Sequence, residues 1–167
     1  MSLLKRRTLL MLPLALAACG FTPVYGPGGN GSALYGNVLV QAPDEMKTGS
    51  RSDSYVLVRE LEDRLGRGGG GSYTLQLELD TRNEGQAFTR ENEITRYALI
   101  GTASYKLIRN GGGSVAASGT VDNFTGYSAT GSTVEALAGE RDAHQRLMAI
   151  LAEQITTELY LADLDGA

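Results

Sequence analysis

Few side chains in this chain could carry out covalent or proton-transfer chemistry. The sequence holds one cysteine, Cys19, and one histidine, His144. A thiol can act as a nucleophile, pair in a disulfide, bind a metal or carry an acyl group, and an imidazole can act as a general base. The neighbours of each residue decide between these roles.

The residues before Cys19 favour its acylation. Three basic residues, Lys5 to Arg7, precede an uncharged apolar run from Leu9 to Ala18, and Leu16-Ala17-Ala18 stands directly before the cysteine. The run is about ten residues long, whereas a membrane-spanning helix needs about 20. The pattern predicts a lipoprotein signal peptide at 1–18 and a diacylglyceryl group on Cys19. The alternatives are an ordinary signal peptide that contains a cysteine and an uncleaved anchor.

Lipidation would occupy the only thiol, so no cysteine would remain for a disulfide, a metal site or a nucleophile. His144 lies three residues before Leu147 on the apolar stripe of a predicted helix, which favours a partly buried structural imidazole over a general base. The acidic pairs Glu91/Glu93 and Glu140/Asp142 lie in charged, solvated stretches, and Gly68 to Gly71 lacks the Lys-Ser/Thr of a phosphate-binding loop. The sequence predicts no catalytic residue, cofactor or metal site.

Composition indicates one acidic domain of ordinary size. Residues 1–18 carry 3 of the 15 Lys and Arg and none of the 19 Asp and Glu, so their removal changes the formal net charge from −4 to −7. This balance argues against a nucleic-acid partner, although a local basic patch could still bind an anionic lipid.

Periodicity predicts six elements in the order β-α-β-β-β-α. Leu57, Leu61 and Leu65 form one apolar helix face, and Leu147, Leu151, Ile155 and Leu159 form another. Alternation from Tyr73 to Asp80 indicates a strand with one buried face. We expect strands at 37–41, 73–80, 94–108 and 115–124, and helices ending at Leu65 and running from about Ser132 to about Ala162.

These elements predict an α+β fold, a two-layer sandwich with two helices packed on one face of a four-stranded mixed sheet. The domain is expected at 37–163, after a lipidated Cys19 and a flexible Gly- and Pro-rich tether at 19–36. Residues 81–93 are expected to form a polar connection, and Asp122-Asn123 to cap the turn after the last strand. Ser132 and Glu135 have the spacing of a capping box.

Basic residues gather on or beside the third strand in an otherwise acidic chain: Arg90, Arg96, Lys106 and Arg109. Arg96 and Lys106 share the less apolar strand face. This strip could pair with phosphates through charge-assisted hydrogen bonds, or it could be an ordinary solvated face. Ala98, Ile100 and Phe124 are apolar on the side away from the helices, which suggests a surface covered by a partner.

Several segments together resemble the lipopolysaccharide-assembly lipoprotein family, LptE. The most specific segment is CGFTPVYG, from Cys19 to Gly26, followed by a domain of this size and element order. Weaker agreement lies in Phe88-Thr89-Arg90, in Asp122-Asn123 and in the stretch from Leu137 to Asp142.

The resemblance implies an outer-membrane lipoprotein on the periplasmic side. It would plug and help to assemble the β-barrel LptD, and take part in the transport of lipopolysaccharide to the outer leaflet, without catalysis. The family's lipopolysaccharide-contacting basic positions fall near Arg90 and near Gly139 to Arg141, where Arg141 is the neighbouring basic residue. With the two cations on the strand, the candidate contacts are Arg90, Arg96, Lys106 and Arg141. The alternative is a periplasm-facing lipoprotein that binds a small apolar or lipid ligand between helices and sheet.

Overall fold

A computed structural model describes residues 24–26, 29–43, 51–69, 71–90 and 93–164. The elements, in chain order, are α2 (Asn30–Leu34), β1 (Val38–Val40), α3 (Arg51–Leu65), β2 (Tyr73–Phe88), β3 (Ile94–Arg109), β4 (Val115–Ser128) and α4 (Thr133–Leu161). The predicted signal peptide and Cys19 lie outside the described residues. Among the described helices, none has the length and apolar composition needed to cross a membrane.

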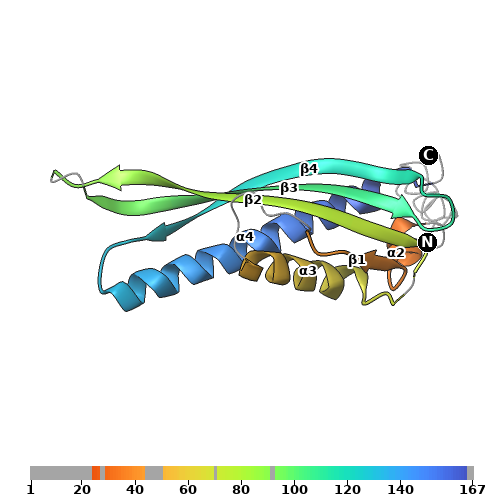
Figure 1. The fold of residues 1–167 in the computed structure, drawn as a ribbon, viewed down its shortest axis with the longest axis horizontal. Coiled ribbons are helices and arrows are strands. Elements are labelled where there is room, and N and C mark those ends of the chain that lie inside the picture. Colours follow the sequence, from red (N-terminus) through yellow and green to blue (C-terminus); the bar gives the residue numbers. More distant parts are fainter. Residues whose placement is uncertain (1–23, 27–28, 44–50, 70, 91–92, 165–167) are drawn as a thin grey trace, which may run out of the picture.

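The four strands form one mixed sheet in the order β1-β2-β3-β4. β1 pairs parallel with β2, and the two other pairings are antiparallel. Both α3 and α4 lie on one face of the sheet (Figure 1), and within the described residues no helix lies on the opposite face. The predicted α+β sandwich is therefore confirmed.

Leucine side chains fill the space between the helices and the sheet. Leu57, Leu61 and Leu65 of α3 are completely buried, as are Leu147, Leu151, Ile155 and Leu159 of α4. They meet Leu75 and Leu107, the odd-numbered and inward residues of β2 and β3, which are also completely buried. The helix stripes and the strand alternation in the sequence thus identify the core correctly.

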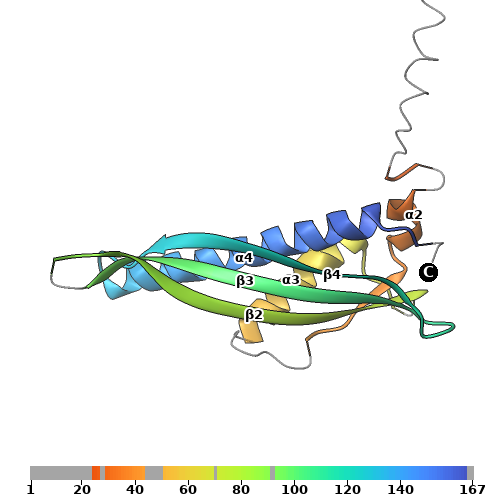
Figure 2. The same ribbon diagram turned by 90° about the horizontal axis from the view of Figure 1, so that it is seen from above.

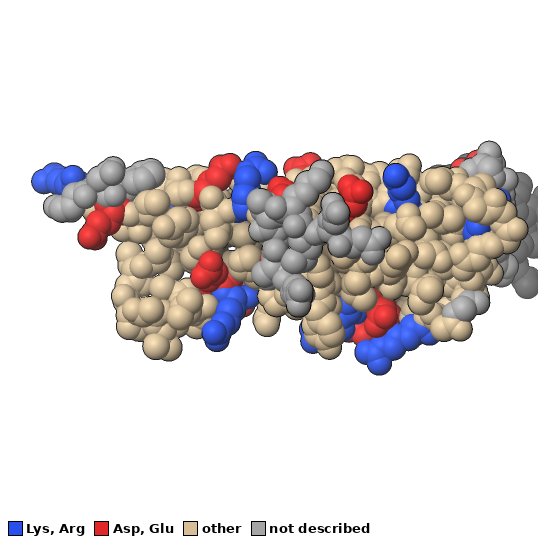
Figure 3. Space-filling view, viewed as in Figure 1, with Lys and Arg blue, Asp and Glu red and all other residues tan. Residues whose placement is uncertain are grey.

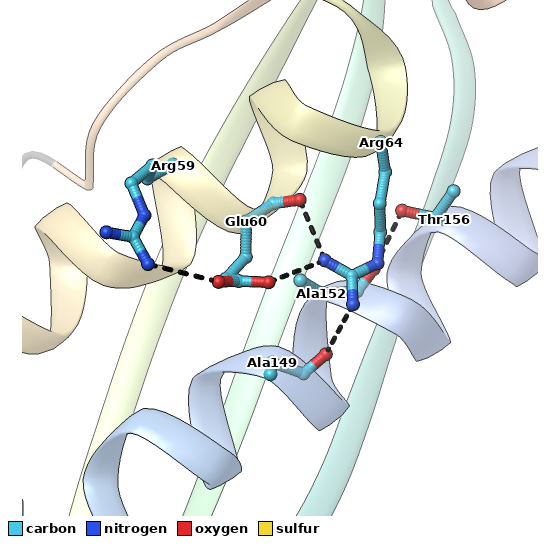
Figure 4. A network of polar contacts seen from close by, with 6 residues as sticks. All are labelled: Arg59, Glu60, Arg64, Ala149, Ala152 and Thr156. Carbon is cyan, nitrogen blue, oxygen red and sulfur yellow. Dashed lines mark hydrogen bonds and ion pairs between the residues drawn. The ribbon is translucent and has the colours of Figure 1, made fainter.

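A polar contact at the edge of this core joins the two helices (Figure 4). The guanidinium of Arg64 on α3 donates to Glu60 Oε2 at 2.8 Å and reaches Ala149 O of α4 at 3.5 Å. The hydrogen bond from Arg64 lowers the pKa of Glu60. Arg64 and Glu60 are partly exposed, so we regard this network as a positioning contact more than a source of stability.

The sheet is longer than predicted. β2 pairs with β3 as far as Phe88 opposite Ile94, so the polar connection expected at 81–93 is wrong for residues 81–88. The prediction failed because Arg82, Asn83 and Glu84 are exposed and show no apolar alternation; backbone pairing with β3 holds them in the strand. The hairpin of β2 and β3 projects beyond the start of α4 (Figure 1).

β4 also continues past its predicted end, to Ser128. Asp122 and Asn123 therefore lie inside the strand and do not cap a turn, and Asn123 Oδ1 accepts a hydrogen bond from the Phe124 N–H. The capping box of α4 forms as predicted: Ser132 Oγ accepts from Glu135 N, and Glu135 Oε2 accepts from Ser132 N at 2.7 Å. Gly139 lies within a continuous helix.

The expected tether is partly folded. Residues 30–34 form the short helix α2, and Leu34 is completely buried in the core. The expectation of a flexible tether up to Gly36 is therefore wrong for residues 29–36. A five-residue helix offers little periodicity, and the surrounding glycines and prolines are typical of a linker, which explains the error.

Candidate interaction surface on the outer face of the sheet

Strand register decides which predicted residues share the face that the helices leave uncovered. Even-numbered residues of β3 point outward, so Arg96, Ala98, Ile100 and Lys106 lie on this outer face, as the sequence predicted. Arg109 is odd-numbered and belongs to the inner side. Its guanidinium donates to Leu164 O, so it holds the chain that follows α4 and does not join a basic strip.

An apolar patch lies near the middle of this face. Phe124 of β4 is directly opposite Ile100 of β3 in the register, and Ala98 is opposite Gly126. The Phe124 side chain is 68% exposed, which is unusual for a large aromatic residue. The patch borders a shallow hollow of about 550 Å³ that Arg96 and Asp122 also line. An apolar floor with charges at its edge can take an apolar group that carries a polar or charged end.

Lys106 lies in different surroundings. It lines a second hollow, of about 440 Å³, together with Glu78 and Asp80 of β2. These carboxylates reduce the attraction that Lys106 could exert on a phosphate. Basic and acidic side chains are likewise interspersed on the side of the molecule seen in Figure 3. The structure therefore divides the predicted cationic strip into two unlike parts.

Distance also separates the four candidate contacts. Arg96 and Lys106 are ten positions apart on β3, which is about 33 Å at the rise of a strand. Arg90 is exposed in the turn between β2 and β3, and Arg141 is exposed on α4, in the other layer. The four residues therefore do not form one site; Arg90 and Arg96 belong to the same end of the hairpin.

His144 has the structural role that the sequence favoured. Its Nδ1 lies 2.8 Å from Asp53 Oδ2, and Asp53 is only 2% exposed, at the beginning of α3. The hydrogen bond to Asp53 raises the pKa of His144, and burial of the imidazole partly offsets this rise. The negative charges of Asp53 and Glu140 raise the pKa further. The pair joins α3 to α4.

Two of the four carboxylates that could form acid-base pairs, those of Glu140 and Asp142, have other partners. Asp142 forms an exposed ion pair with Arg146 at 2.8 Å, and Glu140 accepts a hydrogen bond from Tyr127 Oη at 3.4 Å. Burial and the Glu140 charge raise the pKa of Tyr127 to about 12. Glu93 is exposed, and Glu91 lies outside the described residues. Within the described part of the chain, no group of three or more His, Cys, Asp or Glu could hold a metal ion.

Sequence reasoning missed two features of this surface. Asp122, which was expected to cap a turn, lies two residues before Phe124 on the same face of β4 and lines the hollow beside it. Arg146 reaches from α4 to donate to Gly126 O on β4 at 3.3 Å, which brings a helix cation to the edge of the sheet. No local signal in the sequence indicates this contact, since it depends on the packing of α4 under β4.

The comparisons with known proteins agree with this fold. The model of the family described as LptE, lipopolysaccharide-assembly, matches residues 38–159, which reach from β1 into the last turns of α4. No match was found among curated proteins.

Solved structures extend the comparison to the fold. A protein of Caulobacter crescentus CB15, described as a candidate lipoprotein, superposes with a TM-score of 0.62 at 24% identity, over 85% of this chain and 100% of its own. The uncharacterized lipoprotein B of Nitrosomonas europaea superposes with a TM-score of 0.53 at 11% identity, over 74% of this chain and 81% of its own. At these identities the likeness shows a shared fold.

Proposed function

The chain belongs to the LptE family of lipopolysaccharide-assembly proteins, and we propose that it is the lipoprotein that plugs an LptD-type β-barrel of the outer membrane. In this role it helps the barrel to assemble and takes part in inserting lipopolysaccharide into the outer leaflet. The role is one of binding and needs no catalysis. A diacylglyceryl group on Cys19 anchors the protein on the periplasmic side.

The observation that carries the plug proposal is the uncovered apolar patch on the outer face of the sheet. Phe124 is 68% exposed beside Ile100 and Ala98, on the face of the sheet that no described helix covers. Exposed contiguous apolar surface on a folded domain marks an interaction site, and aromatic residues are enriched at the centres of protein interfaces. The wall of a barrel lumen would cover this patch.

The dimensions of the sheet support the same role. β3 has 16 residues, about 50 Å at the rise of a strand, whereas an ordinary strand has five or six. The hydrocarbon core of a bilayer is about 30 Å thick. A sheet of this length can therefore run along the whole lumen of a membrane-spanning barrel.

The tightly filled interior favours a plug over a ligand-binding domain. Leu75, Leu107, Leu151 and Ile155 between the helices and the sheet are completely buried, and both hollows described above open on the outer face. A carrier of a small apolar ligand would need open space where these side chains pack.

Among the basic residues, Arg90 and Arg96 are the best placed to meet lipopolysaccharide phosphates. Both lie at the projecting end of the β2–β3 hairpin, and Arg96 borders the apolar hollow. A guanidinium can bind a phosphate with two parallel hydrogen bonds. Arg141 is a further exposed cation on α4, and Lys106 is less suited because Glu78 and Asp80 share its hollow.

Co-purification from native membranes tests the plug proposal. The full chain should be recovered with the barrel protein in mild detergent, and Phe124→Asp should reduce the recovered barrel by about tenfold because it places a charge in the covered patch. Tyr55→Asp is the matched control, since Tyr55 is 69% exposed on α3, away from the outer face. A monodisperse monomer without a barrel, or an equal effect of both variants, would contradict the proposal.

A further inference from the structure

The segment before β1 is attached to the end of α4. The Asn30 side-chain amide donates to Tyr160 O at 3.1 Å and also to Ala162 O. These carbonyls belong to the end of α4, where backbone acceptors have no partner within the helix. α2 thus acts as a cap for α4, and Figure 2 shows it beside the last turns of that helix.

Residues just upstream take part in the same attachment. Val24 O accepts a hydrogen bond from Gly31 N at 2.9 Å. The Tyr25 ring meets the Tyr160 ring edge-on with centroids 5.7 Å apart, and their hydroxyl oxygens are 3.0 Å apart. Val24, Tyr25 and Asn30 are therefore held on the folded domain by specific contacts.

This attachment shortens the connection to the lipid anchor. Cys19 precedes Val24 by five residues, which span at most about 18 Å when fully extended. A tether that remained free up to Gly36 would reach about 60 Å. With the short connection, the end of the molecule that carries α2 cannot move far from the bilayer surface.

Exposed apolar side chains gather at this same end. Tyr25 and Tyr35, which flank α2, are 66% and 59% exposed, and Leu161 at the end of α4 is 78% exposed. The Tyr35 ring lies over Gly66, just beyond the end of α3. Tyrosine suits the boundary between water and lipid, because its ring is apolar and its hydroxyl is polar.

We propose that this end of the molecule rests on the bilayer and that Tyr25, Tyr35 and Leu161 enter the lipid headgroup region. The inference rests on the proposed lipidation of Cys19, which brings the end within reach of lipid. It also fixes an orientation: the β2–β3 hairpin lies at the opposite end of the molecule (Figure 1) and points away from the inner leaflet. In a barrel lumen, Arg90 and Arg96 are then directed toward the outer leaflet.

A fluorescence measurement tests the contact, because the chain contains no tryptophan. Tyr35→Trp and Leu161→Trp each introduce a single indole at the proposed contact. Val134→Trp is the matched control, since Val134 is 76% exposed on the first turn of the same helix as Leu161, about 40 Å away along its axis. The lipidated variants are placed in phosphatidylethanolamine and phosphatidylglycerol vesicles, with and without brominated acyl chains.

Brominated lipid should lower the tryptophan fluorescence of the Tyr35→Trp and Leu161→Trp variants at least twofold and leave that of Val134→Trp unchanged. Equal quenching of all three variants, or of none, would overturn the contact if mass spectrometry shows acyl chains on Cys19. A cysteine without acyl chains would overturn the lipidation proposal itself, and the contact with it. Mass spectrometry thus separates the two failures.

Discussion

The imidazole of His144 joins two helices through a single carboxylate. Its partner Asp53 is almost completely buried, and the Nδ1–Oδ2 distance is 2.8 Å. The pKa of His144 is raised in the folded protein, chiefly by this bond, so folding favours the imidazolium. The stabilisation is therefore complete at pH values below the ordinary pKa of about 6.5 and is lost as the pH rises through the raised pKa.

The His144→Gln variant tests this pair. At pH 5.5 we expect its free energy of unfolding to lie about 2 kcal/mol below that of the unchanged protein, because Asp53 loses a charge-assisted hydrogen bond. The difference should shrink as the pH rises above 6.5, since the unchanged protein then loses its imidazolium. Urea denaturation at several pH values measures both quantities, and a difference that is constant from pH 5.5 to pH 9 would contradict the account.

For the basic residues of β3, the sequence predicts the strand face on which each lies but not its neighbours. Arg96 and Lys106 are separated by an even number of positions, and this spacing correctly predicted that both lie on one face of the strand. They differ in their neighbours from other strands: Lys106 lines a hollow together with Glu78 and Asp80 of β2, while Arg96 lines a hollow together with Phe124 of β4. Cross-strand neighbours follow from register, which no short pattern in this sequence specifies, so the two sites could not be ranked before the structure was known.

At the scale of elements, the predictable parts are those that bury an apolar face. The leucine stripes of α3 and α4 predicted both helices and the residues near which they end, and the alternation of Tyr73 to Asp80 predicted the type and the start of β2. Residues 82–87 of β2 have no buried side chain, and their pairing with β3 holds them in the strand. α2 is too short to show a helical pattern of apolar residues in the sequence, and tertiary contacts of Asn30 and Leu34 hold it in place. Such elements depend on the rest of the fold.

The Gly31→Ala variant tests whether the residues just before α2 are docked on that helix. In an unpacked helix alanine is more favourable than glycine by about 1 kcal/mol. Here an added Cβ would lie 2.7 Å from Val24 O and 2.9 Å from the Tyr25 ring, so the segment before α2 must shift. We expect the free energy of unfolding to fall by about 1 kcal/mol through the loss of these contacts.

Gly112→Ala is the control for this prediction, because nothing lies within 4 Å of a Cβ at that position. Urea denaturation should show a clear loss for Gly31→Ala and little change for Gly112→Ala. An increase in stability of the Gly31→Ala variant would mean that residues 24 and 25 are not docked on α2.

At the scale of the whole molecule, the fold is a long sheet with different ends. One end carries α2 and the end of α4, and the other carries the β2–β3 hairpin (Figure 1). Arg90 and Arg96 belong to this hairpin. Between the two ends, the uncovered face presents Phe124 and Ile100. In the proposed plug, the end with α2 would lie near the lipid anchor, the barrel would cover the uncovered face, and the cationic end would point toward the outer leaflet.

Depletion of the protein from its own cells tests the central claim most directly. Lipopolysaccharide on the cell surface is measured by its accessibility to an added modifying enzyme or antibody. We predict that surface lipopolysaccharide falls several-fold as the protein is depleted, and that the unchanged protein restores it while Phe124→Asp does not. An unchanged level of surface lipopolysaccharide after depletion would contradict the proposed role.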